Sequence, residues 1–194
     1  MPIAEEPSAR AWLKLLRERL TPERMSHSVF TAEYLSSFAP SLGVDHGDAV
    51  TAGLFHDFYR DHEAASLWKE ARKYRIIMSE TQMREALLLH GPLAAEWCRR
   101  ELDVSEEVYE AIYWHTTGRP GLGLLGQALF VADFAEPSRS FPEAEKARKL
   151  LRLEGFEAAL LYVAEIRHAW IRLQAVVDPD TKAFLIWLKT RGNM

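Results

Sequence analysis

The chain has 194 residues, 48% of them hydrophobic, and a formal net charge of −4 at pH 7. This length is enough for one sizeable domain with an extensive core. The acidic balance argues against a large surface for nucleic acid or for an anionic membrane. Cys98 is the only cysteine, so an internal disulfide is excluded and a reducing compartment is favoured.

The start of the chain gives no sign of export or of membrane insertion. Residues 1–6 include two glutamates and lack the apolar core of a signal peptide. No uninterrupted apolar run approaches the ~18 residues of a membrane span. We therefore expect a cytoplasmic protein with neither a membrane nor a nucleic-acid partner. The sequence leaves the oligomeric state open, a homodimer included.

Helical signals follow one another along almost the whole chain. Apolar side chains recur every three or four residues, and Thr21-Pro22 and Asp178-Pro179 each read as an N-cap followed by a proline at the first helical position. Gly43 is expected as a C-cap. The predicted helices cover residues 9–20, 21–40, 48–59, 62–74, 79–90, 93–102, 105–115, 124–135, 141–153, 156–174 and 179–189.

Strand signals are almost absent from the sequence. There is no sustained alternation of apolar and polar residues and no Asn-Gly or Asp-Gly hairpin turn. We find no internal repeat and no linker. The sequence therefore predicts one all-α domain of about ten helices over residues 1–194, with a core over about 20–140 and further helices, about 141–190, packed on it.

One stretch, Ala52–Asp61, places polar groups where a core would be expected. It begins as an apolar run and then continues with His56 and Asp57. A buried carboxylate is costly unless a positive charge pairs with it, and a metal ion is the simplest such partner for an adjacent imidazole and carboxylate. The alternative is a core histidine beside a solvated aspartate, and the pair alone does not decide between them.

Other predicted helices carry a polar residue on the apolar face. His90 is on the same face as Met83 and Leu87, at the end of a helix that Gly91-Pro92 is expected to break. The same spacing places further nitrogen and oxygen donors on the inward faces of other helices. Together with the His-Asp pair, the candidate ligands are His27, His56, Asp57, His90, His115 and Asp133. The remaining histidines lack this pattern and are expected at the surface or in packing: His46, His62 and His168.

Taken singly, each of these donors has an ordinary structural explanation. A lone histidine on an apolar face is more often a core residue bonded to a backbone carbonyl, and an aspartate such as Asp133 is more often a helix cap or a surface residue. Six together, four imidazoles and two carboxylates, are the ligands of a mixed nitrogen and oxygen metal site. That set suits iron, manganese or zinc better than calcium. It contains no thiolate, so a cysteine zinc site is excluded.

The segments around these residues resemble a known family. They read Arg24-Met25-Ser26-His27, Ala52-Gly53-Leu54-Phe55-His56-Asp57, Leu89-His90-Gly91, His115-Thr116-Thr117-Gly118 and Ala132-Asp133-Phe134-Ala135-Glu136-Pro137-Ser138-Arg139. In this order they resemble the HD superfamily of metal-dependent phosphohydrolases, and within it the YqeK-type branch of symmetrical diadenosine tetraphosphate hydrolases. The resemblance runs from about Leu13 to Leu188 and implies a single helical HD domain with a metal site in its core.

The resemblance implies a ligand set. A first metal ion would be held by His27, His56, Asp57 and Asp133, while His90 and His115 would hold either a second metal ion or phosphate. The expected cofactor is one or two divalent transition-metal ions, iron first, with manganese, zinc, nickel and magnesium as alternatives.

The resemblance also implies substrate contacts. Arg24, Arg60, Thr116 and Arg139 would face the phosphate chain, and the segment with Pro179 and Thr181 would lie near the nucleotide. Two positions depart from the family, which usually has lysine where Arg60 stands and His-Pro where this chain has Asp178-Pro179. The guanidinium keeps the charge but changes the reach and the hydrogen-bond geometry.

The expected activity is hydrolysis of diadenosine tetraphosphate to two ADP by metal-activated water. Asp57 and Arg60 are the expected catalytic groups, and Asp61 either orients the attacking water or is a surface acid. An alternative role for Arg60 is a surface ion pair with Asp61 or Glu63. For Arg139 the alternative is an ion pair with Glu136. The substrate is alternatively a nucleoside mono- or triphosphate, and a third hypothesis is a metal- or nucleotide-binding regulator without turnover.

Overall fold

The structure is a computed structural model that describes residues 7–173 and 177–191. These residues form eleven α-helices and two short 3-10 helices, with no strand among them. The elements are α1 (Pro7–Arg19), α2 (Pro22–Phe38), η2 (Ala39–Leu42), α3 (His46–Phe55), α4 (Ala64–Lys73), α5 (Glu80–Arg84), η3 (Ala86–Leu89), α6 (His90–Leu102), α7 (Glu106–Trp114), α8 (Leu124–Ala135), α9 (Pro142–Leu153), α10 (Phe156–Ile171) and α11 (Pro179–Arg191). The predicted all-α class is confirmed.

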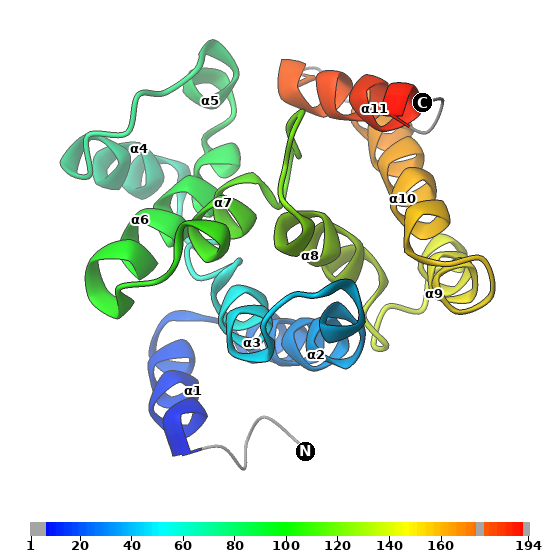
Figure 1. Ribbon diagram of the computed structural model, residues 1–194. Coiled ribbons are helices and arrows are strands. Elements are labelled where there is room, and N and C mark those ends of the chain that lie inside the picture. Colours follow the sequence, from blue (N-terminus) through cyan, green and yellow to red (C-terminus); the bar gives the residue numbers. More distant parts are fainter. Residues whose placement is uncertain (1–6, 174–176, 192–194) are drawn as a thin grey trace.

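Helix α8 lies at the centre of the molecule. It contacts α2, α3, α7, α9 and α10, and Figure 1 shows α4 to α7 on one side of it and α9 to α11 on the other. It is apolar around nearly its whole circumference, as expected for a helix surrounded by others. A polar residue on such a helix is therefore directed into the protein interior.

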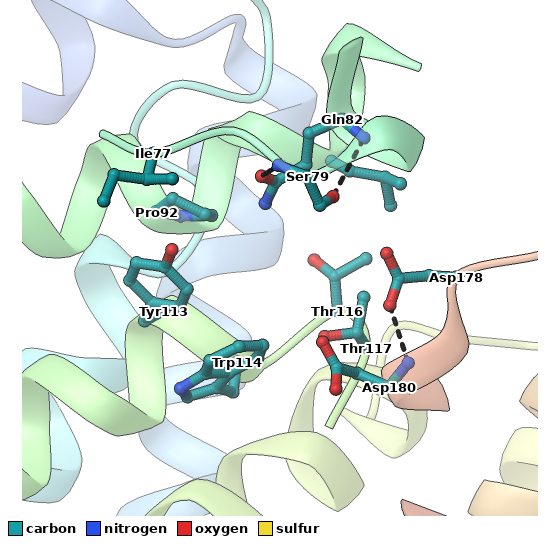
Figure 2. A pocket seen from close by; sticks show the side chains of 11 residues that line it. Ile77, Ser79, Gln82, Pro92, Tyr113, Trp114, Thr116, Thr117, Asp178 and Asp180 are labelled. Atoms are coloured by element: carbon teal, nitrogen blue, oxygen red, sulfur yellow. Dashed lines mark hydrogen bonds between the residues drawn. The ribbon is translucent and has the colours of Figure 1, made fainter. Parts of the chain in front are cut away.

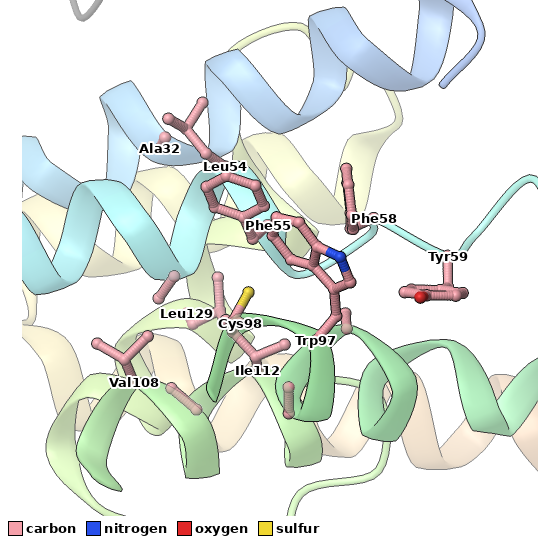
Figure 3. Close-up of a cluster of buried hydrophobic side chains, with 14 of the residues drawn as sticks. Ala32, Leu54, Phe55, Phe58, Tyr59, Trp97, Cys98, Val108, Ile112 and Leu129 are labelled. Atoms are coloured by element: carbon pink, nitrogen blue, oxygen red, sulfur yellow. The ribbon is translucent and has the colours of Figure 1, made fainter. Parts of the chain in front are cut away.

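Two clusters of buried side chains meet at α8. The first, shown in part in Figure 3, gathers aromatic and aliphatic side chains such as Phe55, Trp97 and Ile112 from α1 to α8. The second lies between α8 and the three C-terminal helices and includes Phe130 and Phe184, whose ring centroids are 5.3 Å apart. Each fully buried Phe or Leu contributes roughly 1.5–3 kcal/mol, so both clusters hold α8 in place.

Helices α2 and α3 approach each other closely at Gly53. A Cβ atom at Gly53 would lie 2.4 Å from Ala32 Cα, nearer than carbon atoms can approach. The glycine therefore lets the two backbones pack together. This contact fixes α3 against α2 one turn before the His-Asp pair.

The local signals at helix ends acted largely as expected. Thr21 Oγ1 accepts a hydrogen bond from the backbone N–H of Arg24, and α11 begins at Pro179 after Asp178. Gly43 ends η2 in the left-handed conformation, with φ of 82°. The predicted end of the helix over 156–174 falls on Gln174, which lies outside the described residues.

Two predicted helices are wrong in ways that matter for the site. The helix over 48–59 ends at Phe55, so His56 and Asp57 lie in the turn that follows it. The helix over 79–90 is interrupted at Glu85, whose φ of −123° and ψ of 88° are not helical. His90 does not end that helix, because it is the first residue of α6.

The error at His90 has a physical reason. Gly91-Pro92 lies in the first turn of α6, where proline has no intrahelical hydrogen bond to lose. A Cβ atom at Gly91 would lie 3.0 Å from the carbonyl oxygen of Ile112, so the glycine permits close packing of α6 on α7. Met83 is 54% exposed, so it is not on a buried stripe with His90.

No helix in the described ranges is long and apolar enough to cross a membrane.

Candidate metal centre

Six side chains from five different parts of the chain converge on one buried point. They form three overlapping groups whose donor atoms lie within 4.8 Å of one another. His27 comes from the middle of α2, His90 from the start of α6 and Asp133 from α8. The groups are His27, His56 and Asp57; His56, His115 and Asp133; and Asp57, His90 and His115.

Three of the histidines are held in the same way. Nδ1 of His56 lies 2.8 Å from the carbonyl oxygen of Gly53, three residues earlier. His115 donates in the same manner to Ile112 at 2.7 Å, and His90 to Leu87. Because a carbonyl only accepts, each Nδ1 carries the proton. Each Nε2 is therefore the atom directed to the cluster, as in a metal-ligating histidine.

His27 is oriented by a carboxylate instead of a carbonyl. Its Nδ1 lies 3.2 Å from Glu136 Oε1, and its Nε2 lies 2.9 Å from Asp133 Oδ1. Burial acts to lower the pKa of His27, but its bonds to Asp133 and Glu136 outweigh this and raise it to about 9. Glu136 is fully buried and also accepts hydrogen bonds from Ser138 N and Oγ, both at 2.6 Å.

The two aspartates each divide their oxygens between the cluster and an arginine. Asp57 Oδ1 lies 3.2 Å from His90 Nε2, and its Oδ2 accepts from Arg24 Nη1 at 2.8 Å. Asp133 Oδ1 faces His27, and its Oδ2 accepts from Arg167 Nη2 at 2.5 Å. Burial alone would raise both pKa values.

The surrounding charges outweigh that burial. Imidazoles, His56 foremost, hold the pKa of Asp57 well below its usual range. Arg167 and the imidazoles of His27 and His56 do the same for the pKa of Asp133. Both carboxylates are therefore ionised at neutral pH.

This arrangement fits a divalent cation. Nε2 of His90 and of His115 lie 3.0 Å apart, although each Nδ1 already carries a proton. Nε2 of His56 is buried and has no hydrogen-bond partner. Acceptor atoms that face one another and two carboxylates require positive charge between them, from protons or from a metal ion. Four imidazole nitrogens and two carboxylates are ligands for a divalent transition metal.

Two charged residues that contact the cluster were not among the predicted site residues. Glu136 was read only as an alternative partner of Arg139, although it follows Asp133 by three residues and so shares its side of the chain. Arg167 has no signal in the sequence at all. It reaches the cluster from α10, where its Nη1 also donates to the carbonyl oxygen of His115 at 3.2 Å.

An open cavity of 230 Å³ lies over the cluster, and its lining includes four arginines and two aspartates. We call it the cluster cavity. Four predicted substrate contacts line it together with Arg167, namely Arg24, Arg60, Thr116 and Arg139. Arg139 also forms the ion pair with Glu136 that was its predicted alternative role, since its Nε lies 3.5 Å from Glu136 Oε1.

Asp61 does not line this cavity. Its Oδ2 accepts from the backbone N–H of Thr21 at 2.8 Å, and its Oδ1 lies 3.8 Å from Arg24 Nε. The carboxylate therefore holds the start of α2 and one face of Arg24 and is not directed to the cluster.

A second cavity, of 280 Å³, extends from the cluster toward α11. We call it the threonine cavity after Thr116, Thr117 and Thr181, which line it with Asp178. Pro179 is exposed and does not line it. Where the family usually has histidine, Asp178 accepts a hydrogen bond from Thr81 Oγ1 at 2.6 Å and so joins α5 to the start of α11.

A smaller cavity of 130 Å³ continues from the threonine cavity. Figure 2 shows Thr116 and Thr117 between Asp178 and Asp180 on one side and the rings of Tyr113 and Trp114 on the other. Burial and the nearby Asp178 raise the pKa of Asp180.

The fold and the buried histidine-aspartate cluster together define the class. The model of the HD domain matches residues 24–173, and the chain belongs to the HD-domain family. It is 31% identical over 182 residues to a symmetrical bis(5'-nucleosyl)-tetraphosphatase of Bacillus subtilis, covering 91% of this chain and 95% of the relative. A protein of the same name from Halalkalibacterium halodurans is 29% identical over 178 residues, which cover 88% of this chain and 91% of the relative.

A solved structure confirms the fold. The crystal structure of a predicted HD superfamily hydrolase involved in NAD metabolism from Clostridium acetobutylicum matches with a TM-score of 0.87. The match covers 94% of this chain and 97% of the other at 24% identity. At this identity the likeness concerns the fold alone.

Proposed function

We propose that the protein hydrolyses dinucleoside tetraphosphates, diadenosine tetraphosphate first, symmetrically to two nucleoside diphosphates. The observation that carries the proposal is an arginine-lined cavity directly over a buried cluster of imidazoles and ionised carboxylates. The relatives that cover most of the chain are symmetrical bis(5'-nucleosyl)-tetraphosphatases, and their activity is the one that this cavity supports best.

The cluster is proposed to hold the cofactor. His27, His56, Asp57 and Asp133 would bind a first divalent transition-metal ion, with iron as the first choice, and His90 and His115 a second ion or a phosphate oxygen. Such an ion lowers the pKa of a bound water molecule and polarises a phosphoryl oxygen. The backbone carbonyls that accept from Nδ1 of His56, His90 and His115 hold the proton on Nδ1, so each Nε2 would be free to bind the ion.

The arginines are proposed to hold the phosphate chain. A tetraphosphate carries several negative charges, and a guanidinium binds phosphate oxygens in pairs of parallel hydrogen bonds. Arg60 and Arg139 line the cluster cavity and project from different parts of the chain, so they can contact phosphates on either side of the scissile bond. Such contacts neutralise the charge that develops on the phosphoryl oxygens and on the leaving diphosphate.

Asp57 is proposed as the central catalytic group because it contacts both halves of the cluster. Arg24, bonded to its Oδ2, would keep it ionised and face the phosphates. Asp61 would position Arg24, given its contacts with Thr21 and Arg24. Hydrolysis itself adds one water across the central anhydride: the P–O bond breaks, the oxygen of water joins phosphorus, and its proton is released with the second ADP.

The test is chromatography of early reaction products from metal-loaded protein and diadenosine tetraphosphate. ADP as the sole product is expected. Equal amounts of AMP and ATP would show that the chain is cut off-centre. No turnover of this substrate together with hydrolysis of a nucleoside mono- or triphosphate would move the assignment to that substrate. Tight nucleotide binding without any product would favour a regulator.

A further inference from the structure

A third cavity adjoins the cluster cavity and is lined by no residue of α11. Its volume is 340 Å³, within the range of about 300–1,000 Å³ typical of small-molecule sites. We call it the aromatic cavity, because Phe134, Phe141 and Trp170 form one of its walls. It is continuous with the cluster cavity, with which it shares Arg60, Thr116, Asp133, Arg139 and Arg167.

The three aromatic rings of this wall pack on one another. The ring of Trp170 is tilted by 34° against Phe134, with centroids 5.4 Å apart, and lies 5.7 Å from that of Phe141. Phe134 is 4% exposed, whereas Trp170 is 42% exposed. The indole is therefore held in place from behind and presents free aromatic surface at the cavity.

The threonine and aromatic cavities both adjoin the cluster cavity, and Ile171 lines both of them. Arg60 and Thr116 line all three. A dinucleotide cut at its central anhydride has two phosphates and one nucleoside on each side of the scissile bond. A site for this cut needs two nucleoside pockets next to the cluster, and the threonine and aromatic cavities supply one each.

The linings of the two outer cavities differ in chemistry. The threonine cavity offers hydroxyls and the carboxylates of Glu85 and Asp178, which accept hydrogen bonds from ribose hydroxyls. The aromatic cavity offers Trp170 for a flat base and arginines next to it for the adjoining phosphates. Stacking of a base on an aromatic side chain is tolerant of base identity.

We propose that the aromatic cavity binds the second nucleoside of the dinucleotide by stacking of its base on Trp170. This inference rests on the proposed function. Trp170 is a binding residue in this account and does not touch the reacting phosphorus. The substrate class is thereby narrowed to nucleotides with a base at both ends.

The test compares Trp170→Ala, Trp170→Leu and Trp170→Phe with Phe30→Ala in the metal-loaded protein. Phe30 is a matched control, since it is an aromatic residue with 39% exposure that lines none of the three cavities. Base stacking is lost in the first two variants, so KM for diadenosine tetraphosphate should rise about tenfold or more. Trp170→Phe should lie in between, and Phe30→Ala should match the wild type.

Adenosine 5'-tetraphosphate, which has one nucleoside, serves as the second probe. It can occupy the threonine and cluster cavities alone, so its inhibition constant should be the same in wild type and Trp170→Ala to within about twofold. An unchanged KM for the dinucleotide in Trp170→Leu would overturn the proposal. So would an equal loss for both nucleotides, because the tryptophan would then affect the shared site.

Calorimetry with ADP separates this proposal from the proposed function. Wild-type protein should bind two ADP per chain, and Trp170→Ala one. This result would support the second nucleoside site even if the dinucleotide were not cleaved to two ADP. One ADP in both proteins would refute the site even if symmetrical cleavage were found.

Discussion

Glu136→Gln is expected to weaken metal binding while the fold is retained. The two carboxylate oxygens of Glu136 serve two neighbours, Oε1 facing His27 Nδ1 at 3.2 Å and Oε2 accepting from Ser138 N at 2.6 Å. Glutamine has the same shape but only one acceptor oxygen. If that oxygen faces His27, the amide NH₂ opposes Ser138 N–H, and in the flipped orientation it opposes His27 Nδ1–H.

The magnitude follows from these contacts. If the oxygen faces His27, the Ser138 N–H is left unsatisfied, which costs about 1–3 kcal/mol of stability. In the flipped orientation the proton of His27 moves to Nε2, which can then no longer bind a metal ion. Loss of a carboxylate behind a histidine ligand typically lowers metal affinity ~10–100-fold, equivalent to about 1.4–2.7 kcal/mol.

The assay is competition for the metal with a chromophoric chelator, with helicity followed by circular dichroism. Glu96→Gln is the matched control, because Glu96 also accepts a hydrogen bond, from the Tyr109 hydroxyl at 2.9 Å, but does not contact the cluster. It should bind metal as the wild type does. Wild-type affinity in Glu136→Gln, or the same loss in both variants, would refute the role assigned to Glu136.

Three further changes test the cluster, the phosphate contacts and the fold. Asp57→Ala should lower turnover at least ~10-fold with helicity intact; more than a tenth of wild-type turnover would contradict its role as a ligand. Arg139→Ala should remove a charge-assisted contact of about 1.5–3 kcal/mol and so raise KM for the dinucleotide with metal content unchanged; metal loss would instead assign Arg139 to the support of Asp133, whose Oδ1 lies 3.7 Å from Arg139 Nη2. Gly53→Ala would place a Cβ atom 2.4 Å from Ala32 Cα and should destabilise the protein by about 1–3 kcal/mol in urea unfolding; an unchanged midpoint would show that α2 and α3 can separate freely.

The helices were predictable where capping and periodicity act locally. The helix over 124–135 was predicted with the bounds that α8 has, because Gly123 precedes a continuous apolar run and Pro137 follows it. The inward-facing donors were also predictable as a set. A polar side chain within an apolar stretch must find a partner, and the four histidines and two aspartates in such stretches have each other as partners, although His56, Asp57 and His90 do not lie on the helix faces that were predicted for them.

The sequence could not reveal contacts that depend on packing between distant segments. Periodicity continues through Phe58 and Tyr59, both buried, so it did not show that α3 ends at Phe55. The start of α6 at His90 depends on the approach of α7 to Gly91, which no local pattern encodes. Arg167 was missed for the same reason, since only the docking of α10 on α8 brings its guanidinium to Asp133.

The bond between Arg167 and Asp133 makes the cluster depend on the C-terminal part of the chain. All six cluster donors lie at or before residue 133, but the guanidinium that offsets the charge of Asp133 comes from α10, 34 residues later. A chain that ended before α10 would therefore keep every donor, while Asp133 Oδ2 would lack its arginine partner.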